Sequence, residues 1–224
     1  MMFRSREMAK ALLMTGALAI SSVAIAQVDQ AVLDRGKEVS ALCVACHMES
    51  GAGSSIPGVE YRPRLTGLDA GYIQHQVESY KNGTRVNVSM KPFADLLTEQ
   101  QLHDVAHYYA SLPAVKAEDF KVEASEETLA LGEKLVYHGD WNRYIPACVA
   151  CHGVDAYGIG NTFPNINGQN PAYVKKAIND WKEDSRTNDP LHLMSRVAKR
   201  LTEADIDAVA AYLASQPAAK EEKK

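Results

Sequence analysis

The chain has 224 residues, a formal charge of −4 and 46% hydrophobic residues. Lysine and arginine are scattered among more numerous acidic residues, so the sequence offers no clustered basic face and excludes nucleic-acid binding. All four cysteines fall in two Cys-x-x-Cys pairs, which leaves none to join distant parts of the chain by a disulfide.

The first 26 residues have the pattern of a cleaved signal peptide. A basic start at residues 4–10 precedes an uncharged apolar run at 11–25, and residues 24–26 supply the small-x-small cleavage pattern. An uncleaved anchor is the alternative, but the run is shorter than the roughly 20 residues of a spanning helix. We expect export, a mature chain that begins at Gln27, and at most a peripheral membrane association. Cleavage removes three basic residues and one acid, which takes the formal charge to −6.

The rest of the chain is a tandem repeat of about 100 residues. The segment Cys43–His47 reads Cys-Val-Ala-Cys-His, and Cys148–His152 repeats it letter for letter. Other landmarks recur in the same order: Pro63 and Gly67 as Pro164 and Gly168, Tyr72 as Tyr173, Tyr80 as Trp181, Arg85 as Arg186, and Leu97-Thr98-Glu99 as Leu201-Thr202-Glu203. Duplication of one domain explains this order. The expected segments are a signal peptide at 1–26, domains at 27–112 and 126–216, a linker at 113–125 and a charged tail at 217–224.

Each copy shows helical periodicity in three places and no convincing strand, so we predict an all-α fold. The first helix spans about 32–46 and runs straight into the first motif, whereas its partner near 129–138 is separated from the second motif by an insert. A middle helix follows at 70–82 and again at 171–184. The last helices begin at Thr98 and Thr202, each followed three residues later by Gln101 or Asp205 as in a capping box.

The two Cys-Val-Ala-Cys-His motifs predict covalent haem attachment. Two thiols on one helical turn can add to the two vinyl groups of a haem, while the adjacent histidine reaches the iron. A zinc site would need the two pairs about 15 to 20 residues apart, and a thioredoxin-like dithiol would need a βαβ pattern. Neither is present, so we expect two haem c groups, held through Cys43, Cys46 and His47 and through Cys148, Cys151 and His152.

The methionines indicate how each iron is completed. Of the seven, four lie in the signal segment, and Met48 is too close to His47 to reach the opposite face of the same haem. Met90 and Met194 each precede the shared Leu-Thr-Glu landmark by seven residues, in polar loops after the middle helix. The His/Met pattern of cytochromes c then predicts that these two are the second axial ligands.

The histidines outside the motifs, the repeated arginines and the repeated aromatic residues follow less specific patterns. No further histidine is repeated between the copies, so we expect solvent-facing or packing roles for them, with His192 the closest to a candidate ligand. Arg85 and Arg186 precede each ligand loop, where a guanidinium could pair with haem propionates or simply favour a helix C-terminus. The repeated aromatic residues are expected to flank the haems in the core.

These residues resemble the cytochrome c4 family, the two-haem carriers of bacterial periplasms, over essentially the whole mature chain. The second half resembles it best, through residues 145–153, Gly168-Gln169, Tyr173-Val174, 186–189, Met194 and 207–213. The first half departs from it, because Met48-Glu49-Ser50 replaces the usual glycine and acid after the motif. The resemblance implies two class I cytochrome domains about a pseudo-twofold axis, and electron transfer in the periplasm from a bc1-type complex towards a terminal oxidase.

Two alternatives stay open. The chain could be a two-haem oxidoreductase of the peroxidase or sulphur-compound dehydrogenase type, although such enzymes tend to need an extra catalytic cysteine or a haem without methionine. It could also be a dedicated electron-accepting subunit of a larger enzyme. We expect a carrier that meets redox protein partners; the sequence leaves the oligomeric state open.

Overall fold

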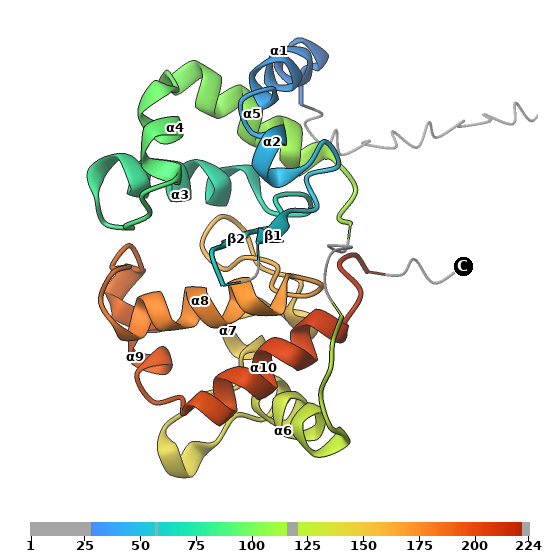
Figure 1. Cartoon of the computed structure of the whole chain (residues 1–224), viewed down its shortest axis with the longest axis vertical. Helices are drawn as coiled ribbons and strands as arrows, with labels where there is room; N and C mark the ends of the chain where they lie inside the picture. Colours follow the sequence, from blue (N-terminus) through green and yellow to red (C-terminus); the bar gives the residue numbers. More distant parts are fainter. Residues whose placement is uncertain (1–27, 57, 116–120, 221–224) are drawn as a thin grey trace, which may run out of the picture.

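The computed structural model describes residues 28–56, 58–115 and 121–220. The predicted signal peptide and part of the linker and tail therefore lie outside the described residues. The two halves of the chain lie one above the other, each with its own group of helices (Figure 1). Among the described residues no helix is long and apolar enough to cross a membrane.

The first half contains five helices and one hairpin. In chain order they are α1 (Gln30–Ser40), α2 (Val44–His47), β1 (Ser54–Ile56), β2 (Glu60–Arg62), α3 (Ala70–Asn82), α4 (Met90–Leu96) and α5 (Glu99–Ser111). The second half repeats the helices, and its described residues contain no such hairpin. Its elements are α6 (Glu126–Tyr137), η1 (Trp141–Arg143), α7 (Val149–His152), η2 (Val154–Ala156), α8 (Pro171–Lys182), η3 (Pro190–His192), α9 (Leu193–Ala198) and α10 (Glu203–Ser215). The all-α prediction is confirmed, with one small antiparallel hairpin added.

Local capping explains where the main helices begin. The Thr98 side chain accepts from the Gln101 backbone and the Gln101 side chain returns the bond, and Thr202 and Asp205 do the same for α10. Both predicted capping boxes are therefore confirmed. One sequence interpretation was wrong: the first helix ends at Ser40 and a turn separates it from α2, so it does not run straight into the motif.

A crossing of the first and last helices organises each half. Gly36 in α1 lies so close to α5 that a Cβ atom there would meet the Asp104 carbonyl oxygen, and Gly132 in α6 meets the Ala208 carbonyl of α10 in the same way. Only glycine permits this approach of two backbones. Each half then closes its own hydrophobic core, with Tyr109 and Val105 in the first and Leu135, Ile206 and Leu213 in the second.

A buried carboxylate on each last helix is held by an arginine. Asp104 is 2% exposed and accepts from Arg35 Nε at 2.6 Å, and Asp205 accepts from Arg143 Nη1 at 2.7 Å. The arginines come from different places, α1 in the first half and η1 in the insert of the second. The insert thus replaces a clamp that the first half builds from its first helix.

The halves meet along a short antiparallel contact between equivalent segments. The Val86 amide donates to the Ser185 carbonyl at 2.9 Å and the Thr187 amide donates to the Thr84 carbonyl at 2.7 Å, on either side of the pair Arg85 and Arg186. The hairpin of the first half adds to this contact, because β2 lies against α8 (Figure 1). The contact relates the two copies by a pseudo-twofold axis.

Candidate functional site

One cavity of about 640 Å³ runs through both halves and is lined by every residue that the sequence singled out as a site residue. These residues are Cys43, Cys46, His47, Arg85, Met90, Cys148, Cys151, His152, Arg186 and Met194. Residues more than 100 positions apart thus meet around one connected space, which the repeat alone did not predict.

The two motif histidines share one hydrogen-bond arrangement. His47 Nδ1 lies 2.8 Å from the Pro63 carbonyl oxygen, and His152 Nδ1 lies 2.9 Å from the Pro164 carbonyl oxygen. With Nδ1 as the donor, the lone pair is on Nε2, the tautomer that a metal ligand needs. Burial lowers the pKa of both imidazoles, against the opposing effect of the carbonyl. Each ring is therefore held neutral with one nitrogen available.

The cysteines do not have the character of a redox dithiol. Burial raises the pKa of Cys43 and brings that of Cys148 up to about 11. Exchange-active thiols need a lowered pKa, so the surroundings favour covalent attachment over thiol chemistry. A shared metal site is equally unsupported, since no three metal-binding His, Cys, Asp or Glu side chains gather among the described residues.

Met90 and Met194 reach the cavity from short helices. Met90 is the first residue of α4 and Met194 the second of α9, so the prediction that they stand in polar loops was wrong. The Met90 amide donates to Asn87 Oδ1 at 2.9 Å, which fixes the start of α4. Met48 is 49% exposed and does not line the cavity.

Arg85 and Arg186 lie beyond the helix ends and bond across the domain boundary. Arg85 Nη2 donates to Tyr173 of the second half at 2.9 Å, and Arg186 Nη2 donates to Tyr72 of the first half at 3.2 Å. Each guanidinium also stacks on the aromatic ring of its own half, Arg85 over Tyr80 at 4.8 Å and Arg186 over Trp181 at 4.2 Å.

Gln76 joins this network, although no sequence pattern indicates it. Its Oε1 accepts from Arg85 at 2.9 Å, from Arg186 at 2.8 Å and from Asn188 at 3.1 Å. The position equivalent to Gln76 in the second half is Ala177, so a search for repeated residues passes over it. One side chain of the first half therefore serves both arginines.

Two histidines outside the motifs have surface or packing positions. The side chain of His192 is 67% exposed and it does not line the cavity. His75 does line the cavity, but its Nε2 lies 2.9 Å from the Asn188 carbonyl oxygen and belongs to the contact between the halves. The expectation of surface or packing roles matches these positions.

The donor set of each half fits a covalently attached haem. Two thiols and an imidazole come from one short helical segment, and a thioether comes from a second helix at the same cavity. When bound, haem iron supplies one-electron chemistry, and His/Met ligation is its pattern in cytochromes c. The protein's own part is to hold the Nδ1 protons on the proline carbonyls and to surround the groups with apolar side chains.

Known proteins share this arrangement. The sequence matches the cytochrome c family over residues 33–113 and again over 132–217, one match in each half. A thiosulfate dehydrogenase electron acceptor of Thiomonas intermedia is 41% identical over 80% of this chain and 80% of its own length.

Two solved structures have similar folds. Cytochrome c4 from Pseudomonas stutzeri has a TM-score of 0.72 at 30% identity, over 82% of this chain and 98% of that one. Thiosulfate dehydrogenase from Marichromatium purpuratum has a TM-score of 0.72 at 32% identity, over 83% of this chain. This chain covers 40% of that protein.

Proposed function

This chain belongs to the cytochrome c family and is a two-haem electron carrier, and we propose that it accepts electrons from a thiosulfate-oxidising dehydrogenase in the periplasm. The observation that carries the proposal is the 41% identity to a thiosulfate dehydrogenase electron acceptor, against 33% to a curated cytochrome c4. All four cysteines are spent on the two motifs, which leaves no cysteine for sulphur chemistry in the chain itself. A carrier for another enzyme suits this composition better than a dehydrogenase does.

The axial ligands that we propose are His47 with Met90 for the first haem and His152 with Met194 for the second. All four residues line the one cavity, and both histidines carry the same proline contact. Thioether ligation raises the potential of haem iron relative to imidazole, which suits a carrier that must be reduced readily. We further propose that Arg85 and Arg186, whose side chains line the cavity between the halves, pair with the propionates.

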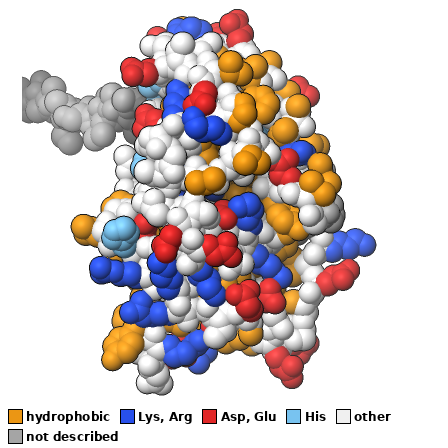
Figure 2. Space-filling model, turned by 60° about the vertical axis from the view of Figure 1, so that its left-hand side comes forward, with side chains coloured by type: hydrophobic (Ala, Val, Ile, Leu, Met, Phe, Trp, Pro, Cys, Tyr) orange, Lys and Arg blue, Asp and Glu red, His pale blue; other side chains and the backbone are white. Residues whose placement is uncertain are grey.

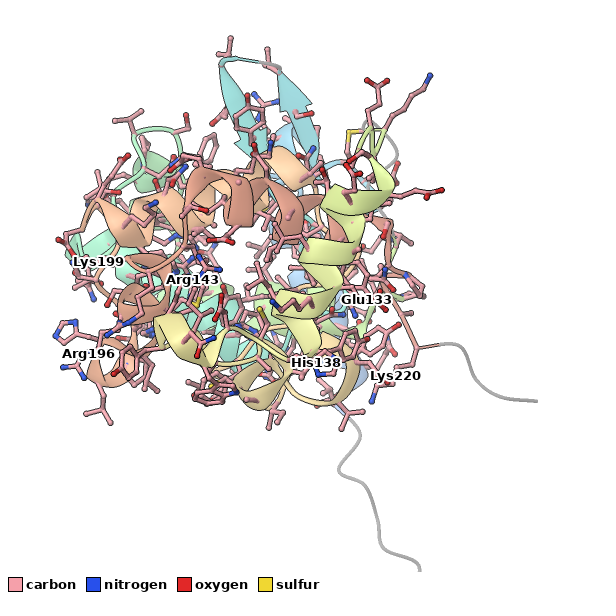
Figure 3. The ribbon with its side chains drawn as sticks, turned by 90° about the horizontal axis from the view of Figure 1, so that it is seen from below. Glu133, His138, Arg143, Arg196, Lys199 and Lys220 are labelled. Atoms are coloured by element: carbon pink, nitrogen blue, oxygen red, sulfur yellow. The ribbon has the colours of Figure 1, made fainter. Side chains whose placement is uncertain are left out.

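The two halves present different surfaces near their methionines. Around α4 the exposed residues include the apolar Val86, Val88 and Leu96, beside the ion pair of Lys91 and Asp95. Around α9 they include the basic Arg196 and Lys199, which lie on the same side of the second half (Figure 3), and also the apolar Leu191 and Leu193. Figure 2 shows one face of the molecule, on which hydrophobic side chains gather in the upper part and most lysine and arginine lie in the lower part, with acidic side chains among them. We propose that one end receives electrons and the other passes them on.

A kinetic comparison tests the proposed donor. Ferric protein is mixed with thiosulfate and a catalytic amount of thiosulfate dehydrogenase, and haem reduction is followed in a stopped-flow spectrophotometer. We expect rapid reduction that needs both enzyme and thiosulfate. Val88→Glu and Arg196→Glu should each slow a different half-reaction, reduction by the donor or oxidation by the acceptor. Reduction no faster than without the enzyme would refute the donor, and loss of the same half-reaction in both variants would refute the separation of the two ends.

The second candidate is a carrier from a bc1-type complex to a terminal oxidase. It is favoured by the match to cytochrome c4, which this chain covers almost completely. The same stopped-flow experiment with quinol and a bc1 complex measures it. Faster reduction in that arm than in the thiosulfate arm would make this the function.

Location in the periplasm rests on residues 1–26, the proposed cleaved signal peptide. Fractionation of cells followed by N-terminal sequencing should recover a mature chain that begins at Gln27. A chain that retains residues 1–26 would show that the segment is an anchor.

A further inference from the structure

A pair of histidines on α5 stands apart from the haem cavity. His103 and His107 are four residues apart on the same helix, and their ring centroids are 4.4 Å apart. Both side chains are partly exposed, and neither lines the haem cavity. The equivalent positions in the second half are Asp207 and Ala211, so the pair is not part of the repeated haem architecture.

The hydrogen bonding of His103 prepares one nitrogen for a ligand. Its Nδ1 lies 3.0 Å from Asp104 Oδ1, and that carboxylate is held in place by Arg35 and by Gln100. Arg35 donates to both oxygens of this carboxylate, at 2.6 and 3.2 Å, as to an ionised partner. An ionised acceptor fixes the proton on Nδ1 and leaves the Nε2 lone pair free. This carboxylate–histidine arrangement is the one that orients histidine ligands at metal sites.

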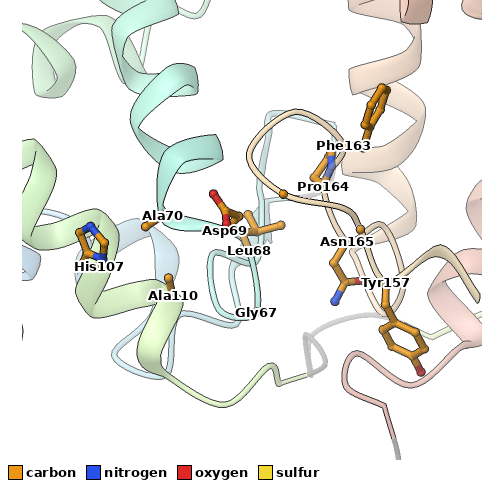
Figure 4. Close-up of a pocket in the computed structure, with 12 residues that line it drawn as sticks. Gly67, Leu68, Asp69, Ala70, His107, Ala110, Tyr157, Phe163, Pro164 and Asn165 are labelled. Carbon is orange, nitrogen blue, oxygen red and sulfur yellow. The ribbon is translucent and has the colours of Figure 1, made fainter. Parts of the chain in front are cut away.

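His107 adds a second nitrogen beside an open space. It lines a pocket of about 430 Å³ between the halves, together with Asp69 at the start of α3 and Tyr157 of the second half (Figure 4). The space gives room for water molecules to complete a coordination shell, and the Asp69 carboxylate favours a cation there.

We propose that His103 and His107 form a two-histidine site for a transition-metal dication such as Zn²⁺, with water as the remaining ligands. Histidines at positions i and i+4 of a helix lie on one face and bind zinc in this way in other proteins. No third His, Cys, Asp or Glu side chain completes a cluster among the described residues, so the site differs from a closed structural zinc site. Bound metal would join two turns of α5 and stabilise the first half.

Calorimetric titration of the holoprotein with Zn²⁺ tests this site. The holoprotein is used because its covalently bound haems occupy His47 and His152. It carries no affinity tag and is washed with a chelator, so that no other added site or bound metal interferes. We expect one Zn²⁺ per chain and a rise in melting temperature on addition of the metal. His103→Ala and His107→Ala should each weaken Zn²⁺ binding by at least ~10-fold. Removing a residue that only hydrogen-bonds to a metal ligand already costs about 10-fold or more, and these variants remove a ligand itself.

His138→Ala is the matched control. His138 is an exposed histidine in the second half, and among the described residues no second histidine ring lies against it as His107 lies against His103. It should leave the affinity unchanged. If an alanine variant folds poorly, His103→Gln and His107→Gln keep the polar surface and give the same comparison. Failure of the wild type to bind Zn²⁺, or equal affinity in all variants, would overturn the site. The titration is independent of electron transfer, so it stands or falls apart from the proposed function.

Discussion

Met48 has a backbone conformation that only glycine adopts easily. It follows the proposed ligand His47 directly and has φ 66° and ψ 157°, while the equivalent residue of the second motif, Gly153, has φ 78° and ψ 175°. A residue with a Cβ in this region is strained by about 1–3 kcal/mol. The first half has Met48 where the second half has a glycine, so this position is strained and lies next to the proposed ligand His47.

The comparison of Met48→Gly with Met48→Ala isolates this strain. Both changes remove the same half-exposed methionine side chain, so loss of side-chain contacts beyond Cβ cancels. The glycine variant is relieved of the 1–3 kcal/mol of strain but gains unfolded-state entropy that costs about 0.4–1 kcal/mol. We therefore expect Met48→Gly to be the more stable variant by about 1 kcal/mol. At an ordinary position in a helix or strand glycine is the less stable of the two by roughly 0.5–1 kcal/mol, so the sign is diagnostic.

Denaturant unfolding of the holoprotein measures the difference, with the sulphur-to-iron charge-transfer absorption as a probe of each haem. Gly153→Ala is the mirror experiment and should destabilise the second half by ~2 kcal/mol or more. Its added Cβ would meet Ile159 at 2.7 Å and the Gly158 carbonyl oxygen at 2.9 Å, in addition to the strain. If Met48→Ala is as stable as Met48→Gly, the strain is absent and the reasoning fails.

Three further predictions concern the carboxylate clamp, the network between the halves and the ligands. Burial raises the pKa of Asp205 but bonds from Arg143 and Thr202 outweigh it and bring it to about 2, below the unfolded value of about 3.9. Stability from this group is thus present above that unfolded value and is lost as pH falls towards 2, so acid unfolding of Asp205→Asn should be less steep there; an unchanged slope would contradict the clamp. Gln76→Leu removes an acceptor from the two buried guanidinium groups of Arg85 and Arg186, and we expect the free energy of unfolding to fall by ~3 kcal/mol or more. Gln74→Leu, at a nearby position outside the network, is the control. A loss for Gln76→Leu as small as that of the control would show that the network contributes little to stability. Met90→His should lower the potential of one haem in a spectroelectrochemical titration, and an unchanged titration would remove Met90 from the ligand set.

Much of the fold was predictable because the repeat fixes it twice. The capping signals at Thr98 and Thr202 mark the same helix in both halves, and the middle helix begins at Ala70 and Pro171 as expected. The short elements were missed for a physical reason. Helices α4 and α9 have seven and six residues, and each strand of the hairpin has three, which is too few to establish a period.

The candidate site was predictable as far as local chemistry reaches. Motif spacing identified Cys43 to His47 and Cys148 to His152 as site residues, and their equivalent positions in the repeat identified Met90 and Met194. Both methionines line the same cavity as the motif cysteines and histidines. The destinations of Arg85 and Arg186 depend on how two domains pack, and the sequence holds no record of that contact. Gln76 was missed for a related reason, since its role exists only where the two halves meet.

The contact between the halves has the form of a symmetric dimer interface within a single chain. Arg85 donates a hydrogen bond to a tyrosine of the second half, and Arg186 donates one to the equivalent tyrosine of the first half. Such reciprocal contacts between equivalent residues are those of a twofold homodimer interface. Joining the copies keeps them at high effective concentration, so a small polar interface suffices to hold them together. Fusion also frees the two copies to diverge, since a change in one no longer appears in the other. The Gln76 and Ala177 pair is such a divergence, and it gives a symmetric contact one asymmetric centre through which the two halves can be tuned separately.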